Sequence, residues 1–271
     1  MKPFVFETMG TTASLTIADG AIAEGTIAEN RTADLTMTAG DPQLVVRVIE
    51  SFADFDQRFS LYRVDSELSA VSRGDLALTA ASSQLRNSYA AAIGWRNNTG
   101  GAFTPHRPDG VIDLNGIVKA LAMQAASDLL LSTGHLNWCL NVGGDVLCSG
   151  TQADAVAWSI GIVDPFDRSS LICALAIPAD KPAMATSGIA ERGEHIWTSA
   201  VARQIDDAAR FVQVTVVAAT IELADVLATA IIAGGQATLD LATANFAIDV
   251  FAICADGTML STPGFNVALA S

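Results

Sequence analysis

A short apolar segment toward the C-terminal end carries two oxygen-bearing side chains at helical spacing. Asp225 and Thr229 lie four residues apart in a strongly helical pattern, so their side chains share one helix face. A carboxylate and a hydroxyl on a largely apolar helix are costly unless they are satisfied. Because hard oxygen ligands suit Mg²⁺, we predict a metal site here. The alternative is that Asp225 pairs with a lysine or arginine of the core.

The segment 113–119 could bind an anion. Small polar residues and a glycine open a predicted helix, and Lys119 lies near its first turn. Free backbone N–H groups at a helix start, together with an ammonium group, attract negative charge. Ordinary capping of the helix by Asp113 or Asn115 explains the same residues equally well.

Two other segments contain residue types often found beside ligands. Gly143 and Gly144 follow a predicted strand. Paired glycines allow the backbone to approach a ligand closely, although a tight turn is the commoner explanation. Tyr62 stands between polar residues after an amphipathic helix, where it could stack on an aromatic ligand. The alternative is a half-buried tyrosine, with Asp65 or Ser66 as the cap of the next helix.

Two features are weaker signals of function. Residues 183–188 form a run of mostly small side chains that either lines a pocket or makes a turn. His195 follows a polar segment. A lone histidine is more often structural than catalytic, and its titration near neutral pH is its main recommendation for a role in catalysis.

These residues need a scaffold, and hydrophobic periodicity predicts both helices and strands. Helical spacing predicts helices over residues 42–59, 83–97, 116–132 and 221–233, the last closed by two glycines. Apolar runs predict strands over residues 12–17, 34–38, 138–142, 158–163, 171–177, 212–218 and 248–254. Because helices and strands do not alternate strictly, we predict an α+β fold. Residues 1–271 would form a single domain, either as one unit or as two closely packed lobes.

The composition excludes some classes of partner. Hydrophobic residues make up 51% of the 271 residues, and 15 basic against 29 acidic residues give a net charge of −14. Such a chain repels nucleic acids and anionic membranes. A phosphorylated ligand would therefore need backbone N–H groups, a few placed cations or a metal ion. No segment of about 18 residues lacks polar groups, which argues against membrane insertion.

The cysteines and the N-terminal residues bear on location. No C-x-x-C pair occurs, so we expect reduced thiols, mostly buried, rather than zinc ligands or disulfides, at Cys139, Cys148, Cys173 and Cys254. The first residues contain neither an apolar run long enough for a signal peptide nor a lipid-anchoring cysteine. The chain as given therefore predicts a cytoplasmic protein, although an exported protein with a trimmed leader would look the same.

Eight short motifs, taken in order, resemble the ApbE family of flavin transferases over nearly the whole chain. They lie at residues 9–11, 60–62 with 65–68, 101–103, 113–119, 143–145, 185–188, 195–196 and 224–230. Each motif alone is weak, but eight in the family order at compatible spacing carry the resemblance.

The resemblance implies an ApbE-like, T-fold-related architecture of mixed, largely antiparallel sheets with packed helices. It implies FAD and Mg²⁺ as ligands, and transfer of FMN through a phosphoester bond to a Thr or Ser of a target flavoprotein, with release of AMP. Asp225 and Thr229 would hold the metal, Tyr62 would contact the flavin or adenine of FAD, and His195 would act as base toward the acceptor hydroxyl. The residues that would bind FAD are Met9, Ser60, Tyr62, Asp65, Asn115, Lys119, Gly143, Gly144, Asp145, Thr186 and Ser187.

Several positions depart from the family pattern, and three of the affected places would normally carry Asp. The replaced or disrupted positions are Thr104, Ala120, Gln124, Trp197, Thr198 and Ser199. Each lost carboxylate removes a possible metal ligand, hydrogen-bond acceptor or base, so we predict that FAD binds while transfer is slow or absent. Two other functions stay open: a non-catalytic FAD-binding protein, and an FAD pyrophosphatase that gives FMN and AMP.

Overall fold

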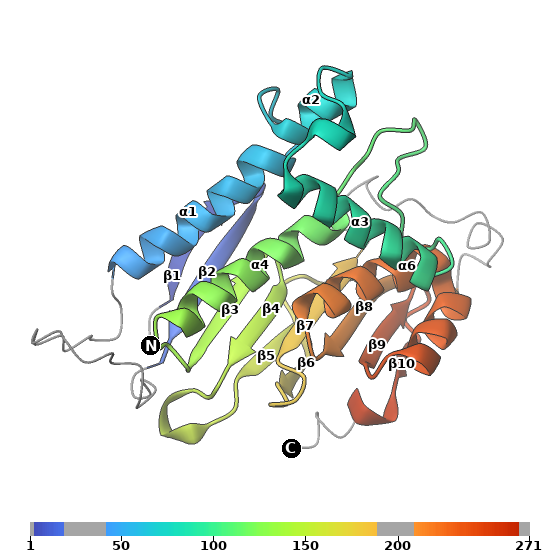
Figure 1. The fold of residues 1–271 in the computed structure, drawn as a ribbon. Coiled ribbons are helices and arrows are strands. Elements are labelled where there is room, and N and C mark those ends of the chain that lie inside the picture. Colours follow the sequence, from blue (N-terminus) through green and yellow to red (C-terminus); the bar gives the residue numbers. More distant parts are fainter. Residues whose placement is uncertain (1–2, 19–41, 189–208, 266–271) are drawn as a thin grey trace, which may run out of the picture.

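The computed structural model describes residues 3–18, 42–188 and 209–265, which form a large sheet with helices on one face (Figure 1). The sheet has the spatial order β1-β2-β3-β4-β7-β8-β9-β10, and every pairing in it is antiparallel. Its strands are β1 (Phe4–Thr8), β2 (Thr11–Ile17), β3 (Trp138–Val142), β4 (Asp145–Ser149), β7 (Ala183–Gly188), β8 (Phe211–Ala218), β9 (Asp249–Cys254) and β10 (Met259–Ser261). A separate antiparallel hairpin consists of β5 (Ser159–Val163) and β6 (Leu171–Ala176).

Three long helices form the layer over the sheet. They are α1 (Pro42–Phe59), α4 (Asn115–Ser132) and α6 (Ile221–Asn245), and α4 contacts both of the others (Figure 1). α2 (Glu67–Arg73) follows α1, and α3 (Ser83–Asn98) packs against α4. Short 3₁₀ turns lie at Leu78–Ala80 and Ala153–Ala155. The α+β prediction and the expected antiparallel sheet are confirmed.

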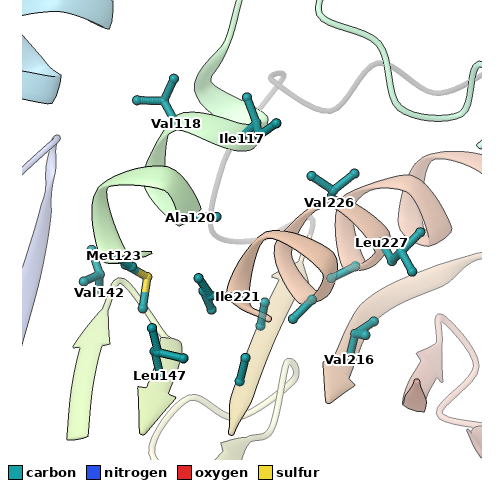
Figure 2. Close-up of a cluster of buried hydrophobic side chains, with 14 of the residues drawn as sticks. Ile117, Val118, Ala120, Met123, Val142, Leu147, Val216, Ile221, Val226 and Leu227 are labelled. Carbon is teal, nitrogen blue, oxygen red and sulfur yellow. The ribbon is translucent and has the colours of Figure 1, made fainter. Parts of the chain in front are cut away.

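Apolar side chains cover both faces of the central strands. On the helix side, Met123 of α4 and Leu227 of α6 belong to the same buried cluster as Val216 of β8 (Figure 2). On the opposite face, Val217 of β8 belongs to a second buried cluster, together with Leu175 of the β5–β6 hairpin. Because β8 is buried on both faces, its sequence is mostly apolar, with Gln213 and Thr215 as its buried polar residues.

The longest helix, α6, differs from its prediction at its C-terminal half. The glycine at which the helix was expected to close, Gly235, has φ 67° and ψ −154°, which breaks the regular helix. The chain then resumes a helical path to Asn245, where Leu239 and Ala242 are buried. The predicted end is therefore a kink. By length and composition α6 could cross a membrane, but 67% of its most apolar window is buried inside the protein, as in a core helix.

Most of the other predicted elements are confirmed to within one residue at each end. The predicted strand at 34–38 lies outside the described residues. The interpretation of residues 183–188 as pocket lining or a turn is wrong, because they form the central strand β7, where small side chains allow α6 to pack closely. All four cysteines are free: Cys148 and Cys254 are buried and the other two are half-buried. The sequence patterns did not predict β1, β4 or β10, whereas the helix expected after Asp65 or Ser66 is α2.

Candidate functional site

A cleft of about 1010 Å³ opens beside the starts of α4 and β4. Several parts of the fold meet around it: the end of α1 with the following loop, the loop between α3 and α4, the start of α4, the middle of α6, two hairpin turns and the β5–β6 loop. Its lining residues are Met9, Gly10, Thr11, Asp56, Phe59, Ser60, Tyr62, Arg63, Ala102, Phe103, Thr104, Asp113, Asn115, Gly116, Val118, Lys119, Gly143, Gly144, Arg168, Thr229 and Ala233.

Two hairpin turns form one edge of the cleft. Met9 and Gly10, between β1 and β2, have φ 48° and 72°, and Gly143 and Gly144, between β3 and β4, have φ 58° and 92°. Positive φ at both positions is the mark of the tight turn that suits the twist of a hairpin. A Cβ on Gly143 would lie 2.7 Å from the Thr11 hydroxyl, whereas one on Gly144 would meet open space. The tight-turn interpretation of the two glycines therefore holds, and the same turn also lines the cleft.

Three charged residues from three elements form a buried cluster next to the cleft. Lys119 of α4 makes an ion pair with Asp145, the first residue of β4, and its Nζ lies 3.7 Å from Oδ1 of Asp225 on α6. The side chains are 9%, 0% and 1% exposed, respectively. We call these three residues the buried cluster. The predicted alternative for Asp225, pairing with a basic residue of the core, is therefore realised.

Hydrogen bonds to neighbouring strands hold the buried cluster in place. The Thr186 backbone N–H donates to Oδ1 of Asp145 at 3.0 Å, which ties β7 to β4. The hydroxyls of Ser187 and Thr229 lie 3.1 Å apart, which ties β7 to α6. Asp145, Thr186, Ser187 and Asp225 do not line the cleft themselves, whereas Lys119 and Thr229, which contact three of them, do.

The start of α4 differs from the predicted capping by Asp113 or Asn115. Leu114 is the N-cap and makes no side-chain capping bond, whereas Oδ1 of Asp113 accepts a hydrogen bond from the Asn115 backbone N–H at 2.9 Å. Asp113 thus satisfies a backbone N–H group at the N-terminus of α4, although the N-cap itself is Leu114. A Cβ on Gly116 would lie 2.8 Å from the Phe103 ring, so packing explains this glycine.

An exposed segment after α1 forms another edge of the cleft. Tyr62 is 74% exposed and lines the cleft together with Arg63. Asp65 does not line it; a hydrogen bond from Gln57 and the nearby Arg63 guanidinium hold the pKa of Asp65 below its ordinary value. Ser66 caps α2 by accepting from the Ser69 backbone N–H. We call Tyr62, Arg63 and Asp65 the rim segment.

Comparison with known proteins decides the family. The model of the ApbE family matches residues 104–252, which is more than half of the chain. The chain belongs to the ApbE family. A curated relative, the FAD:protein FMN transferase of Vibrio cholerae, is 31% identical over 137 residues, which are 48% of this chain and 40% of that relative. The match to this curated relative thus spans about two fifths of its length.

Solved ApbE structures share the whole fold. The flavin transferase ApbE from Vibrio cholerae aligns with a TM-score of 0.74 at 25% identity and covers 99% of both chains. The ApbE protein from Thermotoga maritima aligns with a TM-score of 0.74 at 17% identity, again over 99% of both chains, and shows likeness of fold alone. The expected ApbE-like architecture is therefore confirmed.

The departures from the ApbE pattern do not all lie at the site. Thr104 lines the cleft. Gln124 lies elsewhere, exposed on the side of α4 that faces α3, where its Nε2 donates to Asp128 at 2.9 Å. Counting Gln124 as a loss at the ApbE site is therefore wrong, because helical spacing from Lys119 turns it to another face. His195, Trp197, Thr198 and Ser199 lie outside the described residues.

The sequence analysis missed four polar or aromatic residues of this ApbE cleft. Asp56 and Phe59 end a helix whose other buried residues form the core, so nothing in the pattern separated them from packing residues. Arg63 lies between the two halves of the motif at residues 60–62 and 65–68, so the motif does not include it. Arg168 lies in the β5–β6 loop, and no motif points to it.

Proposed function

We propose that this protein is a Mg²⁺-dependent FAD:protein FMN transferase that attaches FMN to a Thr or Ser of a target flavoprotein and releases AMP. The observation that carries the proposal is a cleft in which an exposed tyrosine, three cationic side chains and the Thr229 hydroxyl beside the buried cluster all meet. Its volume lies at the upper end of the range of ligand sites, which suits a ligand as large as a dinucleotide.

The proposed reaction moves one phosphoryl group between two oxygens. The acceptor hydroxyl oxygen forms a bond to the phosphorus of FMN, and the bond from that phosphorus to the bridging oxygen of the diphosphate breaks. The bridging oxygen leaves with AMP, and the hydroxyl proton passes to a base. His195 stays our prediction for this base. Transfer of this kind depends mainly on positioning and on stabilising charge at the phosphate oxygens.

The buried cluster and the Thr229 hydroxyl beside it carry oxygen donors of the kind that Mg²⁺ prefers. Lys119 carries one positive charge between the carboxylates of Asp145 and Asp225, so the ionised cluster keeps one net negative charge in a buried place. Thr229 lies one helical turn from Asp225 and lines the cleft. The described residues contain no group of three acidic, histidine or cysteine side chains able to hold a metal. Water and phosphate oxygens would complete the shell, as is usual for Mg²⁺. Such an ion supplies charge stabilisation at the phosphate oxygens.

The side chains of this chain would bind and orient the substrate. Tyr62, which is exposed at the edge of the cleft, would stack on the flavin or adenine ring. Lys119, held by two carboxylates, would keep Asp225 at a defined position next to Thr229, which lines the cleft. The open turn at Gly144 leaves room for a ligand close to the backbone.

The deciding experiment uses a flavoprotein that the Vibrio cholerae transferase flavinylates as the acceptor. The protein is incubated with FAD, Mg²⁺ and this acceptor, and the products are separated by gel fluorescence, mass spectrometry and nucleotide chromatography. Fluorescent acceptor heavier by one FMN, with AMP in equal amount, supports the proposal, provided that a chelator abolishes both. Free FMN with AMP indicates a pyrophosphatase. Bound but unchanged FAD indicates a binding protein, and either of these outcomes overturns transferase activity.

A further inference from the structure

The loop between β5 and β6 places an arginine at the cleft. The hairpin packs on the sheet face opposite the helices, through Ile162 and Leu175. Its loop nevertheless reaches the cleft, where Arg168 lines the same space as Lys119 and Gly144. The segment containing Arg168 matches none of the motifs that pointed to the function.

Local hydrogen bonds hold this loop in a defined shape. Oδ1 of Asp167 accepts from the backbone N–H and the hydroxyl of Ser169, at 3.1 and 2.6 Å, and its Oδ2 accepts from the Ser170 hydroxyl at 2.7 Å. These bonds lower the pKa of Asp167. Oδ1 of Asp164 accepts from the Phe166 backbone N–H at 2.8 Å. The backbone on both sides of Arg168 is thus fixed by its neighbours, which reduces the entropy lost when its side chain binds a ligand.

The charges around the cleft indicate that Arg168 could bind a negatively charged ligand. Among the described residues that line it, the cations are Arg63, Lys119 and Arg168, and the carboxylates are Asp56 and Asp113. Lys119 lies between the two carboxylates of the buried cluster. Nη1 of Arg63 lies 3.7 Å from Oδ2 of Asp56, and its Nη2 lies 3.2 Å from Oδ2 of Asp65. A diphosphate in the cleft would meet these three described cations. A protein of net charge −14 needs a further placed cation to bind a diphosphate.

We infer that Arg168 binds the diphosphate of FAD and so makes the cleft select flavin nucleotides over riboflavin. This inference rests on the proposed function, because it takes FAD as the ligand. A guanidinium group presents a planar fork of N–H donors that matches two phosphate oxygens at once. Because the loop backbone is fixed on both sides of Arg168, the position of its Cα is defined. The side chain can then turn its guanidinium group toward the phosphates.

The test measures equilibrium binding of FAD, FMN and riboflavin to the full chain, without acceptor. Arg168→Ala should weaken FAD binding by ~10–100-fold, the range expected for a lost charge-assisted hydrogen bond, and leave riboflavin binding unchanged. Arg168→Lys should restore part of the FAD affinity, because it keeps the charge and loses the fork. Arg47→Ala is the matched control, since Arg47 is exposed on α1 and does not line the cleft.

The outcomes separate this inference from the proposed function. Unchanged FAD affinity in Arg168→Ala, or an equal loss for FAD and riboflavin, overturns the role of Arg168 even if the unchanged protein transfers FMN. A selective loss for FAD in a protein that transfers no FMN supports Arg168 and overturns the transferase proposal. A wild-type chain that binds no FAD overturns both.

Discussion

The buried cluster and the rim segment both carry opposite charges beside the same cleft, yet they differ in surroundings. Lys119, Asp145 and Asp225 come from three elements and are almost fully buried. The rim segment lies in one loop, and its Arg63 and Asp65 side chains are 42% and 61% exposed. Breaking a buried pair leaves a charge without water, whereas an exposed pair contributes about 0–1 kcal/mol. The cluster therefore organises the cleft before any ligand arrives, and the rim is free to adapt to one.

The sharpest way to test this difference is to remove one negative charge from the buried cluster. Asp225→Asn keeps the volume and leaves Lys119 with Asp145 as a one-to-one pair, so we expect the fold to stay intact. It removes a carboxylate that we propose as a Mg²⁺ ligand, so Mg²⁺-dependent FMN transfer should fall below detection. Circular dichroism and thermal unfolding check the fold, and transfer at a series of Mg²⁺ concentrations checks the activity. Full activity in this variant would exclude Asp225 as a ligand.

Removing the positive charge of Lys119 from the buried cluster should destabilise the fold, in contrast to the removal of one negative charge. Lys119→Met leaves two buried carboxylates without their ammonium partner, so the free energy of unfolding should fall by about 3–5 kcal/mol. The matched control is Arg73→Met, which breaks the exposed pair with Asp75 and should cost no more than about 1 kcal/mol. Urea unfolding of the three proteins measures both values. Equal losses would show that burial does not distinguish the cluster from a surface pair.

The parts of this site that could be predicted from sequence are those that depend on local spacing. The i, i+4 spacing of Asp225 and Thr229 on one helix was read directly, and apolar periodicity located α1 over residues 42–59. The partner of Asp225 could not be identified, because Lys119 is more than 100 residues away and its approach depends on how α4 packs against α6.

Other features were hidden for different physical reasons. The strand β7 contains small residues of low strand propensity, such as Ala183 and Ser187, and is stabilised by tertiary packing between β4, β8 and α6. Arg168 is placed by a hairpin loop whose position relative to the large sheet no local pattern encodes. Helical spacing predicts that the Gln124 side chain points to a different face of α4 from Lys119, whereas the family pattern alone does not indicate the direction of this side chain.

A pair of substitutions can decide which lost carboxylate matters. Thr104 lines the cleft, so Thr104→Asp should raise the rate of FMN transfer by about 10–100-fold, the range typical of supporting groups at metal sites. The introduced carboxylate can still accept from the His106 backbone N–H, as the Thr104 hydroxyl does at 3.2 Å. Gln124→Asp is the matched control. It should leave the rate unchanged, because Gln124 lies on the side of α4 that faces α3, away from the cleft. The reverse pattern of rates would mean that the cleft is not the reaction site.

The smallest expected effect belongs to the rim segment. If Tyr62 stacks on FAD, Tyr62→Ala should lose about 0.5–1.5 kcal/mol of binding free energy beyond the contact area, whereas Tyr62→Phe keeps the ring and should bind almost as well. Isothermal titration with FAD gives the three affinities. Because the side chain is 74% exposed, neither change should alter the free energy of unfolding by more than about 0.5 kcal/mol. Equal FAD affinities for all three proteins would contradict stacking, and a large loss of stability would mean that Tyr62 supports the fold rather than the ligand.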